Sequence, residues 1–152
     1  MKINVYSIEK KEDRFVESII NEFKKSSLNY AKIENIVIFN NKISNFQKNS
    51  LEVEAKLSYL EAFKPYLKGF NVALDVNGKM MDSIKFSKFF ETNSEINFFI
   101  GGAFGFSKEF LDLCDVSISL SEMTMAHKIA KVVLFEQIFR ALTIVNNHPY
   151  HK

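Results

Sequence analysis

The sequence predicts an α/β fold with a mainly parallel sheet and helices on both of its faces. Two observations lead to this prediction. Strand-like segments alternate with segments of helical periodicity along the whole chain, and the strand-like runs, above all residues 70–76, are mostly apolar, which is typical of strands covered on both faces. With 152 residues, 47% of them hydrophobic, the chain can bury one substantial core, so we expect a single domain over residues 1–152.

The first strand and helix are the clearest elements of the first half. Residues 2–8 form a β-branched and aromatic run, and residues 31–39 contain the dense apolar run IVIF, so both segments are expected to be strands. Between them, apolar residues recur at helical spacing from Phe15 to Phe23, with charged and polar residues on the other side. This pattern predicts an amphipathic helix that packs one stripe against the sheet.

A loop and a second helix are expected next. The segment 40–49 is so polar that it should be a surface loop. Ser50 is expected to cap a helix whose apolar residues recur every four positions from Leu51, and Pro65 and Gly69 bring this helix to an end.

The second half continues the alternation of strands and helices. Good capping residues precede two of its helices, and Asn77 to Lys79 is predicted to be a turn. The expected elements are a strand at 70–76, a helix capped by Asp82 or Ser83 that stops near Thr92, a strand at 96–100, a short helix capped by Ser107, a strand at 115–120, and a long helix from about Met125 to Ile144.

Composition excludes several classes of protein. No run of about eighteen apolar residues is present, and the N-terminus lacks an apolar signal core, so we expect a soluble cytoplasmic protein. The formal charge of +2 is too small to indicate a nucleic-acid partner, so any basic surface must be local. Cys114 has no disulfide partner and is interpreted as a small buried hydrophobe, and the three histidines do not form a zinc pattern.

Three carboxyl ends of predicted strands are candidate ligand sites, because ligands of open α/β sheets bind there. They are Leu74-Asp75, Gly101-Gly102 and Leu120-Ser121. In GGAFG, residues 101–105, the missing side chains allow the backbone to approach adenine or a phosphate, although a tight strand-to-helix connection explains them equally well.

Two further segments carry polar groups with candidate roles. Residues 120–127, LSEMTMAH, offer hydroxyls, methionine walls and the free amides of a helix start, although a capped loop is the ordinary explanation. His127 has an ordinary explanation as a surface or capping residue. In the C-terminal HPYHK, Tyr150 can stack, and His151 and Lys152 can donate to a phosphate or an anionic base; Arg140 can add a bidentate phosphate contact or form a helix salt bridge.

Taken together, these segments resemble one family. FFIGGAFGF, LSxMTMAHxxxxxxLxEQxxRAxxI and the closing PYHK are similar to the RlmH family, SPOUT-class methyltransferases that act on N3 of a pseudouridine in large-subunit ribosomal RNA. The resemblance covers the full length, with its diagnostic residues after Asn71. It implies a homodimer with a C-terminal trefoil knot, whereas the residues alone predict an unknotted sheet because knots are rare. One departure is Ala126, where the family commonly has proline.

The resemblance also implies roles for individual residues. The cofactor, S-adenosylmethionine, would be bound by Leu74, Gly101, Gly102, Leu120, Ser121, Glu122, Met123, Thr124 and Met125, mostly through backbone groups. The residues expected to face the RNA are His127, Arg140, Tyr150, His151 and Lys152. The C-terminal tail, residues 148–152, would serve the cofactor site of the partner subunit. No metal is implied.

Methylation of N3 requires loss of its imide proton. A base, either His151 or water, or a cation such as Arg140 or Lys152 that stabilises the anionic ring, would assist this loss. The small net charge favours action on large subunits or assembled ribosomes rather than on free RNA. Two alternatives stay open: a non-catalytic ribosome-binding or assembly module, and a small nucleotide-binding enzyme that uses the glycine loop for phosphate.

Overall fold

A single five-stranded sheet forms the centre of the computed structural model, which describes residues 1–152. The strands lie in the order β2-β1-β4-β3-β5, and every neighbouring pair is parallel. The predicted parallel α/β sheet is therefore confirmed. The strands are β1 (Lys2–Ile8), β2 (Lys32–Ile38), β3 (Phe70–Met80), β4 (Glu95–Ile100) and β5 (Val116–Ser119).

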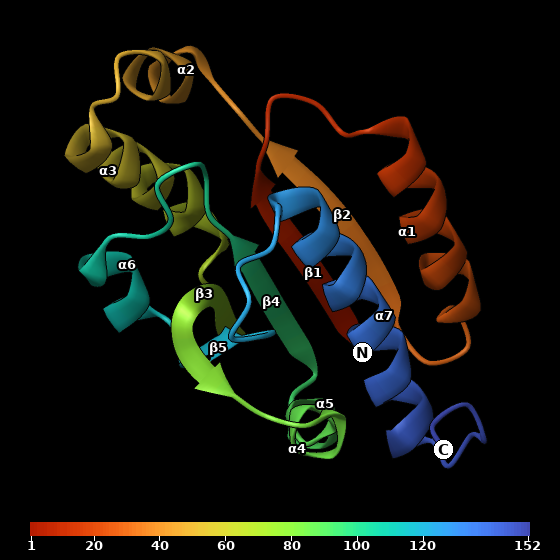
Figure 1. The fold of residues 1–152 in the computed structure, drawn as a ribbon. Helices are drawn as coiled ribbons and strands as arrows, with labels where there is room; N and C mark the ends of the chain where they lie inside the picture. Colours follow the sequence, from red (N-terminus) through yellow and green to blue (C-terminus); the bar gives the residue numbers. More distant parts are fainter.

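Helices cover both faces of this sheet, as predicted (Figure 1). One face carries α1 (Arg14–Ser26), α4 (Ser83–Ser87), α5 (Phe89–Thr92) and α7 (His127–Val145). The other face carries α2 (Asn41–Lys48), α3 (Glu52–Phe63), a 3-10 turn (Lys64–Tyr66) and α6 (Lys108–Leu113). None of these helices is long and apolar enough to cross a membrane.

The two layers of helices create two cores, one on each side of the sheet. Successive side chains of a strand point to opposite faces. In β4, Phe98 accordingly packs in the core beneath α7, where Leu134 and Phe135 are fully buried, and the neighbouring Phe99 packs in the core beneath α3 with Phe63.

The expected surface loop at residues 40–49 is wrong, because α2 occupies this segment. Asn40 caps the helix by accepting a hydrogen bond from the amide of Ile43 at 2.8 Å. Ile43 is fully buried and Phe46 packs beside it in the α3 core. Two apolar residues three positions apart are enough to hold a short helix against the sheet layer, although the segment is polar overall.

Ser50 does not cap the following helix. Its φ of 52° places it in the left-handed region, where it reverses the chain between α2 and α3. Leu51 is the N-cap residue of α3 and makes no side-chain capping bond. Asp82 and Ser107, by contrast, cap α4 and α6 as predicted, through their contacts with the amides of Lys85 and Phe110.

The turn expected at residues 77–79 is also wrong, because β3 continues to Met80. The strand bulges after Leu74 and then returns to β5, so that both Leu74 and Lys79 pair with Ile118. A Cβ atom on Gly78 would lie 2.5 Å from the carbonyl carbon of Ile118. Glycine is required here by the close approach of two strands rather than by a turn.

The final part of the chain follows the predicted order, with β5 inside the range 115–120 and α7 beginning two residues after Met125. The order of strands does not test the trefoil knot, which stays a prediction. The chain ends beside the last turn of α7, while the first turn of α7 lies at the carboxyl edge of the sheet (Figure 1).

Candidate active site

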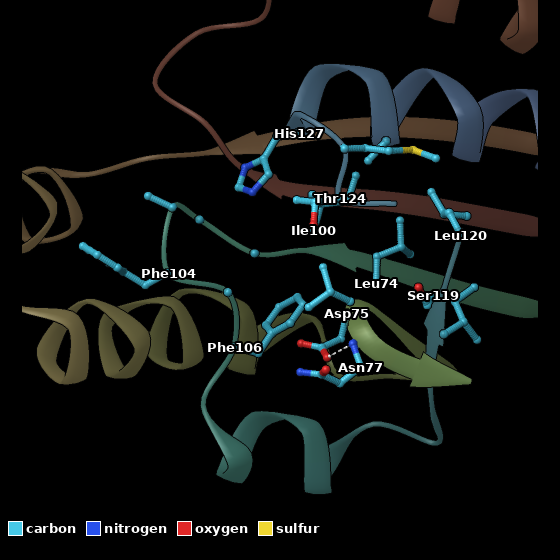
Figure 2. A pocket seen from close by; sticks show the side chains of 18 of the residues that line it. Leu74, Asp75, Asn77, Ile100, Phe104, Phe106, Ser119, Leu120, Thr124 and His127 are labelled. Atoms are coloured by element: carbon cyan, nitrogen blue, oxygen red, sulfur yellow. Dashed lines mark hydrogen bonds between the residues drawn. The ribbon is translucent and has the colours of Figure 1, made fainter. Parts of the chain in front are cut away.

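A cavity of about 530 Å³ lies at the carboxyl edge of β3, β4 and β5, next to the start of α7 (Figure 2). Its size falls within the range of about 300 to 1,000 Å³ that is usual for small-molecule sites. Eight residues of the predicted cofactor set line it: Leu74, Gly101, Gly102, Leu120, Ser121, Met123, Thr124 and Met125. The ninth, Glu122, is exposed and does not line the cavity.

The glycine loop after β4 is folded tightly on itself. The amide of Gly105 donates to the carbonyl of Gly102 at 3.0 Å, and Gly105 has a φ of 71°, which favours glycine. A Cβ atom on Gly102 would lie 2.4 Å from the ring of Tyr59. The loop therefore keeps bare backbone along one wall of the cavity, with Phe106 closing its end (Figure 2).

The loop between β5 and α7 forms the opposite wall. The Ser119 hydroxyl donates to the carbonyl of Ser121 at 2.8 Å, and the Ser121 hydroxyl accepts from the amide of Met123 at 3.0 Å. These two bonds turn the chain so that Thr124 and Met125 line the cavity before α7 begins. The loop shape thus comes from two serines, and Ala126 makes no side-chain capping bond.

Asp75 lines the cavity, and the sequence analysis named it only as part of the strand end Leu74-Asp75, without a role of its own. It is the single carboxylate that lines the cavity, and it accepts from the amide of Asn77 at 2.9 Å within the β3 bulge (Figure 2). Lys56 also lines the cavity, but its ammonium group is 2.8 Å from Glu52. The position of Asp75 at the carboxyl end of a buried strand is the signal that could have assigned it.

A second group of predicted residues lies at the far end of α7. The Arg140 guanidinium donates through Nε and Nη2 to one carboxylate oxygen of Glu136, at 2.9 and 2.6 Å. It also lies 4.8 Å from the centroid of the Tyr150 ring and 3.3 Å, through Nη1, from Nδ1 of His151. The C-terminal segment is therefore folded back onto α7, and Lys152 is exposed at its end.

The structure thus separates the predicted site residues into two groups. His127, the first residue of α7, is exposed and lines the cavity. Arg140 lies thirteen residues further along the same helix, which corresponds to about 20 Å at 1.5 Å per residue. Within one chain, the cluster of Glu136, Arg140, Tyr150 and His151 does not meet the cavity.

The sequence matches the family described as "Predicted SPOUT methyltransferase" over residues 1–151. A protein of Aliarcobacter butzleri named "Ribosomal RNA large subunit methyltransferase H" is 54% identical over 152 residues, which is 100% of both chains. A protein of the same name from Campylobacter concisus is 50% identical, again over 100% of both chains. The chain therefore belongs to the SPOUT methyltransferase family.

Solved structures give a weaker similarity. The SpoU methyltransferase AviRb from Streptomyces viridochromogenes, in complex with the cofactor AdoMet, is 12% identical, with a TM-score of 0.46 over 97% of this chain and 58% of that chain.

Proposed function

We propose that this chain, working as one domain over residues 1–152, transfers a methyl group from S-adenosylmethionine to N3 of a pseudouridine in 23S ribosomal RNA. The observation that carries the proposal is the cavity at the carboxyl ends of β3, β4 and β5, whose walls are the same segments that resemble the family motifs. The full-length relatives named as large-subunit ribosomal RNA methyltransferases support the substrate. We expect it to act in the cytoplasm, where large ribosomal subunits are found.

The residues present fit S-adenosylmethionine. Of the 22 residues that line the cavity, 12 are hydrophobic, which suits the adenine ring and the thioether carbons. The bare backbone at Gly101 and Gly102 offers polar groups at the ring edge. Asp75 provides a carboxylate that can accept from ribose hydroxyls or face the positive sulfonium group.

A triphosphate fits the same cavity poorly. Phosphate oxygens need several cations or free donors. Lys56, the lysine of the lining, is already paired with Glu52. The carboxylate of Asp75 would repel a phosphate. This charge distribution favours the methyltransferase over the alternative of a small nucleotide-binding enzyme that uses the glycine loop for phosphate. The presence of a cavity of this size favours it over a non-catalytic ribosome-binding or assembly module.

The chemistry divides between the cofactor and the chain. When bound, S-adenosylmethionine supplies an electrophilic methyl group. Leu74, Leu120 and Phe106 line the cavity and would keep water away from a bound cofactor. Holding both reactants in one place would be the main catalytic contribution of the protein. The imide proton of the target base must also leave, and the polar groups for this step lie in the cluster at the end of α7.

The hydrogen bonds of this cluster favour one role for His151. An arginine is always a donor, so the contact from Arg140 Nη1 makes Nδ1 of His151 the acceptor, and the neutral ring then carries its proton on Nε2. In this arrangement His151 and Arg140 can both donate to an oxygen of the anionic base. We therefore propose that they stabilise the imide anion and that water removes the proton.

A homodimer would bring the two groups of residues together. We propose that the C-terminal segment of one copy reaches the cavity of its partner, because about 20 Å separates the groups within one chain. Two apolar side chains beside the cavity favour such a contact: Met123 is 79% exposed and Ile129 is 56% exposed. Exposed apolar residues that gather at one place are typical of an interaction surface.

Calorimetry with S-adenosylmethionine and with ATP tests the proposed cofactor. We expect the former to bind and the latter to give no heat; binding of ATP alone would overturn the proposal. Mass spectrometry of 23S ribosomal RNA from cells that lack the protein tests the product, since one methylated pseudouridine should disappear. Methylation of free 23S RNA as fast as that of large subunits would exclude the preference for assembled particles.

Mixed dimers test the composite site. Leu120→Trp should fill the cavity, and removal of residues 148–152 should remove the tail, so each variant alone should be inactive. In a mixture of the two, one heterodimer site combines an intact cavity with an intact tail, and part of the activity should return. Absence of any recovery, with heterodimers shown to form, would contradict a tail that works in the partner's site.

A further inference from the structure

A second cavity, of about 370 Å³, lies beside the first one at the carboxyl end of β1. Two residues, Ala103 of the glycine loop and His127 of α7, line both cavities, so the glycine loop lies between the first cavity and the second. The second cavity is otherwise formed by the segment after β1, by the end of β2 and by α2, through Ile8, Glu9, Lys10, Phe39, Ser44, Gln47 and Lys48. None of these residues has a role in the function proposed above.

Two lysines without an ion-pair partner, Lys10 and Lys48, line this cavity. Lys10 and Lys48 are both exposed, and neither has a carboxylate within 4.0 Å. Glu9 is the one acidic residue in the lining, and its carboxylate lies 2.9 Å from the ammonium group of Lys131, which is fully buried. Lys131 is shared between Glu9 and Glu12, so this buried cluster keeps one negative charge. The two exposed lysines exceed it by one positive charge and stay available for an anion.

The neutral groups also suit a nucleotide. Ser44 adds a hydroxyl group that can donate to an oxygen, and Phe39 adds a half-buried aromatic ring to the wall. Two cations with a hydroxyl donor suit a phosphate, and contacts of lysine and arginine with phosphates supply the electrostatic part of the affinity for a nucleic-acid backbone. The net charge of +2 on the whole chain makes such a local concentration of free cations informative.

We propose that this second cavity binds a backbone phosphate of the RNA substrate, next to the nucleotide that is methylated. The proposal rests on the function proposed above. Because His127 belongs to both cavities, a strand that enters the first cavity with its target base passes the second with the adjoining phosphate. Lys10 and Lys48 then fix the register of the RNA, and they carry no sequence information themselves.

The double variant Lys10→Ala/Lys48→Ala tests this site by its binding to isolated large ribosomal subunits between 0.05 and 0.2 M salt. Each lost phosphate contact lowers the slope of log affinity against log salt by roughly 0.7 to 0.9, which is about a five- to eightfold loss of affinity per lysine at 0.1 M salt. Affinity for S-adenosylmethionine should stay unchanged. The same titration with inorganic phosphate in place of subunits shows whether the site takes a free ion.

Lys64→Ala is the matched control. It removes one charge from an exposed lysine in the 3-10 turn, at the end of α3 away from the cavity, and this lysine has no carboxylate within 4.0 Å. If the slope of log affinity against log salt is the same for the double variant and the control, the phosphate site is wrong. The proposed methyltransferase function is not affected by that result. Saturation of the site by inorganic phosphate, with subunit binding unchanged in the double variant, overturns it in favour of a free-ion site. A parent protein that binds no large subunits overturns this proposal together with the RNA substrate.

Discussion

Lys131 of α7 forms an ion pair with Glu9, in the segment after β1, at 2.9 Å, although the lysine side chain is completely inaccessible to solvent. The same ammonium group also contacts Glu12 at 2.5 Å and the Ser7 hydroxyl at 3.0 Å. All three hydrogens of the ammonium group thus have acceptors. The contact ties the second turn of α7 to the carboxyl end of β1, so it holds together two elements that border the second cavity.

Replacement of this lysine should destabilise the protein strongly. Lys131→Met leaves two mostly buried carboxylates without a cation, and breaking a buried ion pair costs about 3 to 5 kcal/mol in the free energy of unfolding. Urea denaturation measures the loss. Lys128→Met is the control, because Lys128 pairs with Asp13 at the exposed surface and its removal should have a much smaller effect. Equal losses in the two variants would contradict the central role of the buried pair.

A methyl group added to the glycine loop should disturb the cavity. In Gly102→Ala the new Cβ atom would meet the ring of Tyr59, which is 1% exposed and cannot move freely. We expect a loss of about 1 to 3 kcal/mol in stability, as for overpacked cores, and weaker binding of S-adenosylmethionine.

Tyr59→Leu should relieve this collision. In a double-mutant cycle, the two substitutions together should cost less than the sum of their separate losses, because residues in contact are not additive. Strict additivity would show that Gly102 is required for another reason.

Release of the C-terminal segment should reduce activity more than stability. Glu136 accepts two bonds from Arg140 and one from the Tyr150 hydroxyl at 3.2 Å, and its carboxylate raises the pKa of Arg140. Glu136→Gln weakens this anchor of the tail. The pair is partly exposed, so the free energy of unfolding should change by no more than about 1 kcal/mol. Methylation of large subunits should fall at least roughly tenfold, which corresponds to 1.36 kcal/mol in the activation barrier.

If Glu136→Gln methylates at the parent rate, the position of Arg140 does not depend on this carboxylate. Asp112→Asn is a suitable control, since it removes the exposed i,i+4 partner of Lys108 on α6, and neither residue lines a cavity or contacts the tail.

Cys114 should react slowly in the folded protein. Burial, and secondarily the charge of Asp115, raises the pKa of its thiol to about 12. The thiolate fraction at pH 8 then falls about 1,000-fold relative to a thiol of pKa 9, and the greater nucleophilicity of the rarer thiolate leaves a slowing of roughly 50-fold. Alkylation by iodoacetamide, compared in the native and urea-unfolded protein, measures this ratio.

The same shift links stability to pH. Between the unfolded value of 9.0 and the folded value of about 12, the unfolded state has lost the thiol proton while the folded state keeps it. Stability should therefore fall as pH rises through this window. A Cys114→Ala variant should lose less stability over the same range, and identical pH profiles would contradict the assignment.

Much of the fold followed from the sequence, because the periodicity of apolar residues reports burial directly. The alternation of strands and helices apart from α2, the caps at Asp82 and Ser107, and the strand ends that line the cavity were all predicted. One miss shows why the rest could not be predicted. Asn77-Gly78 reads as a turn, but Gly78 serves the approach of β3 to Ile118, and no local pattern distinguishes these two uses of glycine.

The candidate site, too, was only partly predictable from the sequence. The resemblance to the family supplied the residues of the cavity, while the second cavity depends on α2, which was expected to be a loop. The wide separation of Arg140 from the cavity could have been inferred from the length of α7 alone, since thirteen helical residues span about 20 Å. The pairing of Lys131 with Glu9 could not, because it joins residues more than a hundred positions apart.

The position of β1 inside the sheet, between β2 and β4, has a consequence for synthesis of the chain. Ile3 pairs with Ile33 on one side and with Ile96 on the other. A nascent chain that has completed β2 must wait for about sixty further residues before β4 can cover the open edge of β1, which takes about 3 to 12 s at ordinary rates of translation. During that interval an apolar strand edge is exposed, so chaperones that bind such edges are expected to hold this protein before it leaves the ribosome.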